Sequence, residues 1–470
     1  MAFSSQLFLF AFMPMFFLLY YAFAARWRNW SILAGSLIFY SIGAGSTVVV
    51  LLASVALNQY LAGRIHDALQ PRRLRLLWAG IIINLAGLAV YKYTDFAWNL
   101  VSELVSGLSL GQMPPAPVIP LPIGISFFTF QAISYLADVY RRVIAPAAGY
   151  GEFAVYHTLF PQLVAGPIVR YQEIKAELRK RYIDENALCE GGYRFCLGLG
   201  KKIVLADNLG TVADAMFALP ATELTSGHAW LGLLCYSLQI YFDFSGYSDM
   251  AIGLGQLLGF HFPENFEQPY RSASVTEFWR RWHMTLSRWF LDYVYISLGG
   301  NRHGSLRTYA NLWTVFLLCG LWHGAGLTFV IWGIYHGSLL VIERLAKGLL
   351  GWHPSGTAGV IAAFLLVTIG WVFFRATSLG QALDYLQAMF GLGAATGGYY
   401  SVASYLTSDI LLYLALGLFF AFAPLEGWSR LRVKSFHTMG IQLTFALCSF
   451  AYSTLLLAAN SFNPFIYFRF

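Results

Sequence analysis

The sequence predicts an all-α polytopic membrane protein, and three observations support this fold class. Of the 470 residues, 58% are hydrophobic and only 11% are charged, against about 25% charged in an average soluble domain. The apolar residues form long continuous runs and not the short alternating segments of an outer-membrane barrel. Glycine is frequent, at 44 residues, as suits helices that pack closely in lipid. Because a soluble core of this chain length cannot hide so much apolar surface, lipid must act as solvent for part of it.

The first third of the chain alternates apolar runs with basic loops. The run at 7–25 is long enough to span a bilayer, which takes about 20 apolar residues per helix. The first basic residues, Arg26 and Arg28, follow it, and a second basic cluster lies at 64–75. By the positive-inside rule we expect the N-terminus outside and Arg26 inside. The other apolar runs of this part are 30–42, 46–63, 77–91 and 121–140.

The stretch 150–182 breaks this pattern. It has short apolar pieces around Pro161 and Pro167 and ends in a basic tail at 170–181, which predicts a re-entrant or surface-lying segment on the cytoplasmic side. In all we expect about 11 to 13 membrane-inserted segments. No linker is long enough for a separate soluble domain, so we expect one integral-membrane domain over residues 1–470. The remaining apolar runs are 190–218, 228–260, 306–322, 325–346, 357–374, 408–424 and 438–459.

Charge and cysteine usage exclude several function classes. The net charge of +7 is typical of basic cytoplasmic loops in a membrane protein and does not indicate nucleic-acid binding. The five cysteines are scattered without CxxC spacing, so the sequence predicts neither a metal site nor a disulfide framework. Channels, transporters and membrane enzymes remain, and ionisable residues inside the apolar runs are the candidates for function.

The first candidate is His323, in a stretch at 318–337 that has almost no charge. Glycines spaced four residues apart, among them Gly324, let helices approach closely and leave space around the imidazole. A buried neutral histidine next to glycine is accessible to a ligand and can act as a general base. The alternative is a histidine that binds a carbonyl between helices. His336 follows 13 residues later, about 220° away if the helix is unbroken, so the two imidazoles would not share a face.

The second candidate is His283, within 272–290. Ser274 and the glutamate three residues later form a capping box that starts a helix. On a helical wheel the aromatic residues fall on one arc, Arg280 and Arg281 on the opposite side, and His283 at the edge of the aromatic arc. One interpretation is an anchor at the membrane surface. The other is that His283 points into a cavity while the arginines bind an anionic donor or a partner.

The third candidate is a polar group in 241–253, where Asp243, Ser245 and Asp249 interrupt an apolar run. Ser245 and Asp249 are one helical turn apart. Without a histidine they do not form a nucleophile site. They are interpreted either as hydrogen bonds between helices or as a proton or ion path in a transporter.

The fourth candidate is a pair of broken segments at 121–142 and 160–171, both rich in glycine and proline. Such backbone is tolerated in a membrane only against protein or a water-filled cavity. It indicates the wall of a substrate tunnel or, alternatively, a packing irregularity.

Taken together, these strings resemble the membrane-bound O-acyltransferase (MBOAT) family, and within it the bacterial branch that O-acetylates exopolysaccharides. The resemblance covers nearly the whole chain. The matching strings are MAFSSQLFLF, LPIGISFFTFQAISYLADVYRR, LFPQLVAGPIVRY, YFDFSGYSDMAIGLG, EFWRRWHMTLSRW, GGNR, GLWHGAGLTFVIWGIYHG, GWVFFR and the terminal NPFIYFRF.

The resemblance implies a ring of helices around a central tunnel, in which a cytoplasmic donor meets an extracytoplasmic acceptor. It implies that His323 is the principal catalytic residue, the general base on the acceptor hydroxyl. It also implies that His283 is a second active-site residue, which orients the donor or His323 or assists proton transfer. Residues expected to line or support the tunnel are Trp322, Gly324, Asp243, Ser245, Asp249, His336, Arg280 and Arg281.

The resemblance further implies a multi-pass protein of the bacterial inner membrane that passes acetyl groups from a cytoplasmic thioester donor, acetyl-CoA, for O-acetylation of an exopolysaccharide. No tightly bound cofactor and no metal are implied. The implied partners are a periplasmic or membrane-anchored SGNH-type acetyltransferase, the exopolysaccharide synthesis complex and the lipid bilayer, and not nucleic acid.

Three points stay open at the level of sequence. Only residues 430–437 occupy the place of the long polar insertion of alginate-acetylating members, and this short form favours cellulose over alginate as the polymer. A secondary transporter or flippase would use Asp243 and Asp249 as a coupling path, but it should show sequence-related halves, and none is present. A non-catalytic scaffold of an export complex predicts that His323→Ala is harmless.

Overall fold

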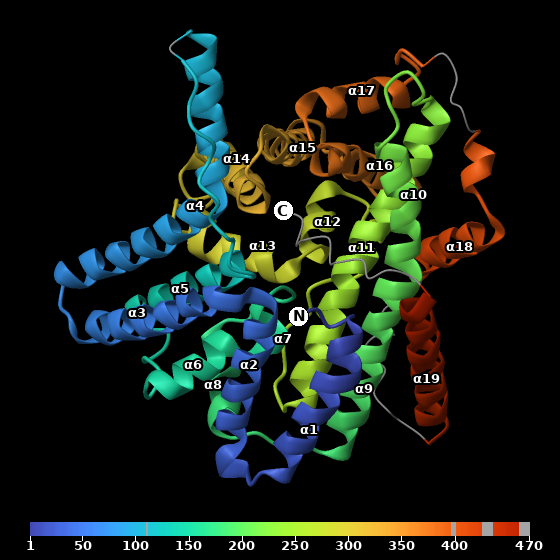
Figure 1. Cartoon of the computed structure of the whole chain (residues 1–470). Coiled ribbons are helices and arrows are strands. Elements are labelled where there is room, and N and C mark those ends of the chain that lie inside the picture. The colour runs from blue at the N-terminus through green and yellow to red at the C-terminus, as the bar shows by residue number, and fades with distance from the viewer. Residues whose placement is uncertain (110, 396–400, 425–435, 460–470) are drawn as a thin grey trace. The chain divides into compact units, whose positions relative to one another are not determined.

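The computed structural model describes residues 1–109, 111–395, 401–424 and 436–459, and it is all-helical, with no strand in these ranges (Figure 1). Part of the short polar segment at 430–437 and the terminal NPFIYFRF string lie outside the described residues. The chain forms two compact units, Met1–Asp184 with Gly255–Phe262 and Glu185–Leu254 with Pro263–Phe470. The expectation that residues 1–470 form one membrane domain stays a prediction.

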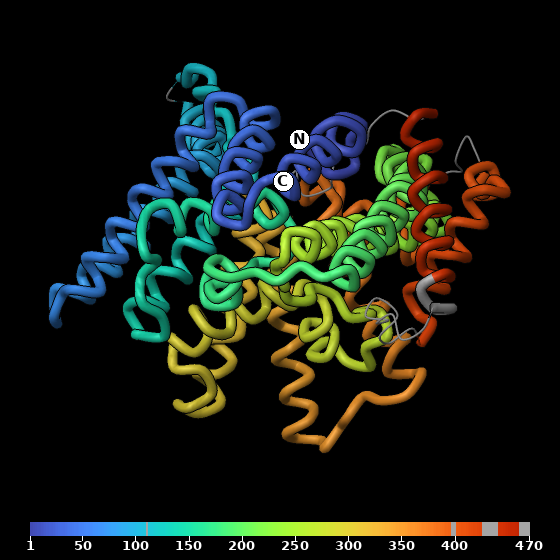
Figure 2. The backbone as a smooth tube through the Cα atoms, turned by 90° about the horizontal axis from the view of Figure 1, so that it is seen from below, coloured from blue at the N-terminus to red at the C-terminus, as the bar shows by residue number. Residues whose placement is uncertain are grey.

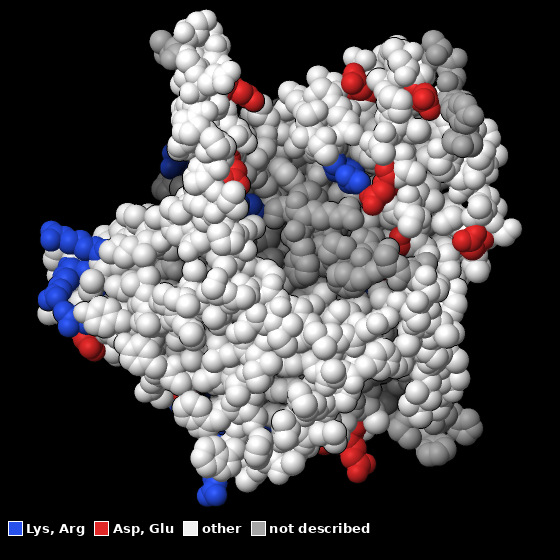
Figure 3. All heavy atoms as spheres, viewed as in Figure 1, with Lys and Arg blue, Asp and Glu red and all other residues white. Residues whose placement is uncertain are grey.

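The first unit is built around α5 (Ile125–Tyr140), whose residues are nearly all buried. This helix packs against α3 and α4. The basic cluster expected at 64–75 lies where α3 ends and α4 begins, and it stands out at the tip of that helix pair in Figure 3. The other helices of this unit are α1 (Met13–Ala22), α2 (Arg28–Ala44), α3 (Val48–Asp67), α4 (Arg72–Gly107), α6 (Tyr150–Thr158), α7 (Phe160–Leu163) and α8 (Tyr171–Arg179).

The segment that was expected to be re-entrant or surface-lying forms the three short helices α6 to α8. Every residue from 153 to 171 is buried, which favours the re-entrant alternative. Gly124, which precedes α5, shows how close this packing is: a Cβ there would lie 2.5 Å from the carbonyl oxygen of Leu163. Its backbone φ of 75° is also one that glycine adopts without strain.

The second unit holds the longer helices and both predicted catalytic histidines. A π-helical segment (Lys201–Ala206) joins α9 to α10, and α9 and α11 run side by side in both views (Figures 1 and 2). The last residues of α11 belong to the first unit. The helices are α9 (Glu185–Gly200), α10 (Asp207–Phe217), α11 (Ser226–Leu257), α12 (Val275–Arg281), α13 (Met284–Phe290), α14 (Gly304–His323), α15 (Leu327–Leu350), α16 (Gly356–Arg375), α17 (Leu379–Met389), α18 (Ser408–Phe422) and α19 (Phe436–Ala459).

Multi-pass membrane insertion is supported by the length and composition of the helices. Among the described residues, five helical segments are long and apolar enough to cross a membrane. The expected total of about 11 to 13 was larger because it also counted short and broken segments. The five are Ala25–Asp67, Arg72–Gly107, Leu327–Leu350, Gly356–Arg375 and Gly440–Ala459, and two shorter apolar helices are Phe8–Ala22 and Ser408–Phe422.

The hairpin of α14 and α15 is closed by glycines, as the sequence predicted. A Cβ at Gly320 would lie 2.3 Å from the carbonyl oxygen of Phe329, and one at Gly333 would lie 2.4 Å from that of Phe316. Gly324 differs from the expectation, since a Cβ there would meet the Phe329 ring at 2.1 Å and not an imidazole. The space that this glycine leaves is filled by an aromatic side chain.

We predict that Gly333→Ala destabilises the protein by about 1–3 kcal/mol, because the added methyl group must push α14 and α15 apart. The measurement is thermal unfolding of the purified protein in detergent. Gly337→Ala is the matched control, since its Cβ would meet the nearest atom, Phe316 Cβ, at an ordinary 3.4 Å. Equal melting of Gly333→Ala and wild type would contradict the close contact.

Candidate active site

His283 lies at a sharp break between two short helices. Ser274 begins α12 as predicted, since its Oγ accepts the N–H of Glu277 at 3.0 Å. The expected continuous helix to residue 290 is wrong, because α12 ends at Arg281 and α13 begins at Met284. The wheel placement of residues on either side of the break therefore does not hold. His283 has φ 43° and ψ 53°, a left-handed conformation that costs a non-glycine residue about 1–3 kcal/mol and persists only where the surroundings hold it.

The segment that holds this break is the irregular chain just before it, around Asn265. The Met284 N–H donates to the Asn265 carbonyl oxygen at 2.9 Å, and the Glu267 N–H donates to the Arg281 carbonyl oxygen at 3.0 Å. These two bonds tie the loop to both ends of the break, so the backbone of His283 cannot relax without losing them.

The side chain of Asn265 fixes the imidazole itself. Its Oδ1 lies 3.0 Å from His283 Nδ1 and also accepts the Thr285 hydroxyl at 2.8 Å. Its Nδ2 donates to Ser248 Oγ at 3.0 Å, and its Oδ1 accepts the backbone N–H of Thr285 at 3.3 Å. Because a backbone N–H can only donate, this second contact fixes the orientation of the amide. Because Oδ1 only accepts, Nδ1 of His283 carries the proton and Nε2 carries the lone pair.

The Nε2 atom of His283 is buried and has no hydrogen-bond partner among the described residues. The ring packs edge-on against Phe244, with centroids 4.6 Å apart. Burial lowers the pKa of this imidazole, so the ring is neutral. The helices on either side have only seven residues each and are too short to span a bilayer. The result is an unprotonated nitrogen held in a buried site among aromatic rings.

His323 is the last residue of α14, where the helix ends because Gly324 turns to an extended conformation. The imidazole is 5% exposed. Its ring centroid lies 5.2 Å from that of Trp332 and 5.0 Å from that of Phe374. Trp322 lies 4.8 Å from His323 and 6.2 Å from His283, again between ring centroids. The structure therefore brings both predicted catalytic histidines against one indole.

His336 belongs to an aromatic core and not to this pair. The helix between His323 and His336 is broken at residues 324–326, so the angle of 220° expected for an unbroken helix does not apply. Trp332 separates the two imidazoles, with its centroid 4.9 Å from that of His336. A Cβ at Gly370 would lie only 2.5 Å from His336 Nε2. This close packing leaves no room for a ligand at that edge and favours a structural role.

The polar group on α11 forms ion pairs with the preceding helical segments. Asp243 Oδ1 lies 2.9 Å from Lys202 Nζ, and Asp249 Oδ2 lies 2.6 Å from Lys201 Nζ. Ser245 Oγ is buried with no hydrogen-bond partner among the described residues, so Ser245 and Asp249 do not pair with each other. Since both carboxylates are bound to cations, the structural interpretation is favoured over an ion path.

Arg280 and Arg281 lie outside the buried site. Arg280 is exposed, and Arg281 pairs with Glu277, one turn away on the same helix, at 2.8 Å. A partly exposed pair one turn apart on a helix is worth at most about 1 kcal/mol. No group of three or more His, Cys, Asp or Glu side chains that could hold a metal ion is present in the described part of the chain.

Sequence reasoning missed Asn265, Glu264 and Arg194. Arg194 had a usable signal: it is an ionisable residue inside the apolar run 190–218, and it pairs with Asp249, which was selected for the same reason. Asn265 had no such signal in the sequence, because a single amide side chain in an irregular segment forms no recognisable pattern. Its role depends on a partner 18 residues away.

Comparisons with known proteins identify the family of the chain. The model of the MBOAT, membrane-bound O-acyltransferase family, matches residues 125–378, a range that includes both histidines. The "Probable alginate O-acetylase AlgI" of Azotobacter vinelandii is 39% identical, and that of Pseudomonas putida 42% identical, each over all of both chains. The "Peptidoglycan O-acetyltransferase" of Helicobacter pylori is 38% identical over 84% of this chain and 80% of its own. The chain belongs to the membrane-bound O-acyltransferase family.

Proposed function

We propose that this O-acyltransferase passes acetyl groups from a cytoplasmic thioester donor, acetyl-CoA, across the bacterial inner membrane for O-acetylation of an extracellular polysaccharide. The observation that carries the proposal is the pair of buried imidazoles, His283 and His323, against the shared indole of Trp322. The ordinary pKa of an imidazole suits general base catalysis near neutral pH.

In the proposed mechanism His323 removes the proton of the acceptor hydroxyl while that oxygen attacks the thioester carbonyl. The tetrahedral intermediate then breaks its C–S bond, and the proton held by His323 passes to the departing thiolate sulfur. One ester forms and one thioester breaks, without a covalent acyl-enzyme. His283 accepts a hydrogen bond at Nε2, from the acceptor hydroxyl or from His323, and so orients the proton transfer.

The proposal includes a ring of about 11 to 13 membrane-inserted segments around a central tunnel, where donor and acceptor meet. Support comes from the match of the family model to residues 125–378. Trp322, whose indole contacts both imidazoles, belongs to this tunnel in the proposal, whereas the space at Gly324 is filled by Phe329. The donor is a diffusible substrate, with no tightly bound cofactor and no metal.

The proposed acceptor polymer is alginate. The expected preference for cellulose has no support, since the relatives that match over the whole chain carry the name alginate O-acetylase. The peptidoglycan-acetylating relative also fits a polysaccharide hydroxyl as the final acceptor. The proposed partners are a periplasmic or membrane-anchored SGNH-type acetyltransferase, which receives the acetyl group, and the exopolysaccharide synthesis complex.

We predict that His323→Ala lowers the acetyl content of the polymer by at least about 100-fold, because the general base is lost. The measurement is the acetyl content of polymer from cells that express each variant at equal level. His353→Ala, a histidine on the exposed surface, is the control and should acetylate normally. Normal acetylation by well-expressed His323→Ala would refute the enzyme mechanism and favour a scaffold.

We predict that Asp243→Asn lowers stability by about 1–3 kcal/mol, because the buried Lys202 ammonium loses one of its two carboxylates and keeps Asp207. Acetylation per mole of folded protein should stay close to wild type. Thermal unfolding in detergent and the acetylation assay measure the two quantities separately. A fully stable Asp243→Asn variant without activity would instead support a coupling path of the kind that a transporter uses.

A further inference from the structure

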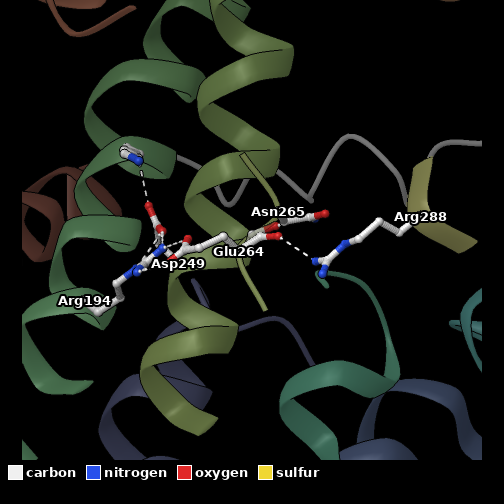
Figure 4. A network of polar contacts seen from close by, with 7 residues as sticks. Arg194, Asp249, Glu264, Asn265 and Arg288 are labelled. Atoms are coloured by element: carbon white, nitrogen blue, oxygen red, sulfur yellow. Dashed lines mark hydrogen bonds and ion pairs between the residues drawn. The ribbon is translucent and has the colours of Figure 1, made fainter. Parts of the chain in front are cut away.

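A buried arginine connects the helix pair α9 and α11 to the loop that carries Asn265 (Figure 4). The Arg194 side chain is 7% exposed. Its Nε and Nη2 donate to Asp249 Oδ1 at 2.8 and 2.7 Å. Its Nη1 and Nη2 donate to the two carboxylate oxygens of Glu264 at 2.8 and 2.6 Å. The guanidinium thus binds Glu264 in the bidentate geometry that gives arginine–carboxylate pairs their directionality.

The arginine is held in place by a close contact between two helices. A Cβ at Gly198 of α9 would lie 2.4 Å from the Gly246 carbonyl oxygen of α11, and a Cβ at Gly253 would lie 2.6 Å from that of Gly191. Arg194 lies between the two glycines of α9, and Asp249 lies between those of α11. Because the backbones touch on both sides of this ion pair, the guanidinium has little freedom to move.

Glu264 is the point at which the irregular loop is attached to this rigid pair. Residues 263–266 have no regular secondary structure, so few backbone bonds define their position. Glu264 directly precedes Asn265, whose Oδ1 accepts the hydrogen bond from His283 Nδ1–H. In Figure 4 the Glu264 carboxylate points toward Arg194, while Asn265 lies on the side of Arg288.

We infer that Arg194 and Glu264 are positioning residues, which fix Asn265 and through it the tautomer and orientation of His283. The inference rests on the proposed function for its effect on acetyl transfer, but not for its effect on the imidazole. Glu264 contacts no reacting atom. It acts by keeping the Asn265 carboxamide where only the Nδ1–H tautomer of His283 fits, so that Nε2 stays an acceptor.

The direct test is the ¹⁵N spectrum of histidine-labelled, purified full-length protein in detergent, in which Nδ1–H and Nε2–H tautomers give different shifts. The His283 signals are assigned by their loss in His283→Gln. Wild type should show one signal pair of the Nδ1–H tautomer. Glu264→Gln should show a mixture of tautomers, and polymer acetylation should fall about 10- to 100-fold, as expected for misplaced catalytic groups.

Two further variants make the result specific. Arg194→Lys keeps the positive charge but loses the bidentate geometry, and it should mix the tautomers in the same way. Glu267→Gln changes only an exposed carboxylate in the same loop and keeps the backbone N–H that donates to Arg281, so it should leave both tautomer and acetylation unchanged. A single wild-type tautomer in folded Glu264→Gln and Arg194→Lys would overturn the inference, whatever their stability. Normal acetylation in His283→Gln and His323→Ala would refute the proposed function while leaving the spectroscopic result intact.

Discussion

The packing of the second unit depends on how the positive charge of one buried guanidinium, that of Arg194, is compensated. Removing a cation from water costs several kcal/mol even after the protein relaxes, so Arg194 can be buried only where oxygen atoms accept its protons at close range. Asp249 and Glu264 supply them, and Lys201 balances the second carboxylate charge. Asp249 can approach only because glycines let α9 and α11 touch. The small residues and the buried charges are therefore parts of one arrangement.

These contacts of Arg194 matter for the candidate active site, because the segments that form the site have too little regular secondary structure to be stable alone. The loop before α12 is irregular, α12 and α13 are short, and His283 has a left-handed backbone. An isolated element of this kind would sample many conformations. Anchoring comes from outside: Arg194 holds the loop through Glu264, and Glu343 of α15 accepts the N–H of Val275 at the start of α12. Bonds of long sequence separation thus replace regular secondary structure.

The sequence predicted the helices well and the site in part. The apolar run 357–374 became α16, the Ser274 cap formed, and Gly320 and Gly333 close the hairpin of α14 and α15 as expected. Periodicity assumes that a helix continues, so it missed the breaks at His283 and at residues 324–326. The sequence also left open whether residues 153–171 are buried, because short helices with polar flanks have similar sequences at a surface and in an interior. Partners such as Asn265 depend on tertiary contacts that no local pattern encodes.

The tautomer of His283 limits what the two imidazoles can do. An Nε2 that carries a lone pair accepts a hydrogen bond but cannot donate one to a developing oxyanion. With Asn265 and Thr285 arranged as they are, turning His283 into a donor requires either protonation, which burial opposes, or loss of the Asn265 bond. In the proposed mechanism the roles therefore differ: His283 accepts and orients, and the positive charge that stabilises the intermediate arises on His323 when it takes the acceptor proton. In that mechanism the Asn265 carboxamide gives His283 its accepting task, because it holds the proton-bearing nitrogen of this ring on the side away from the open Nε2.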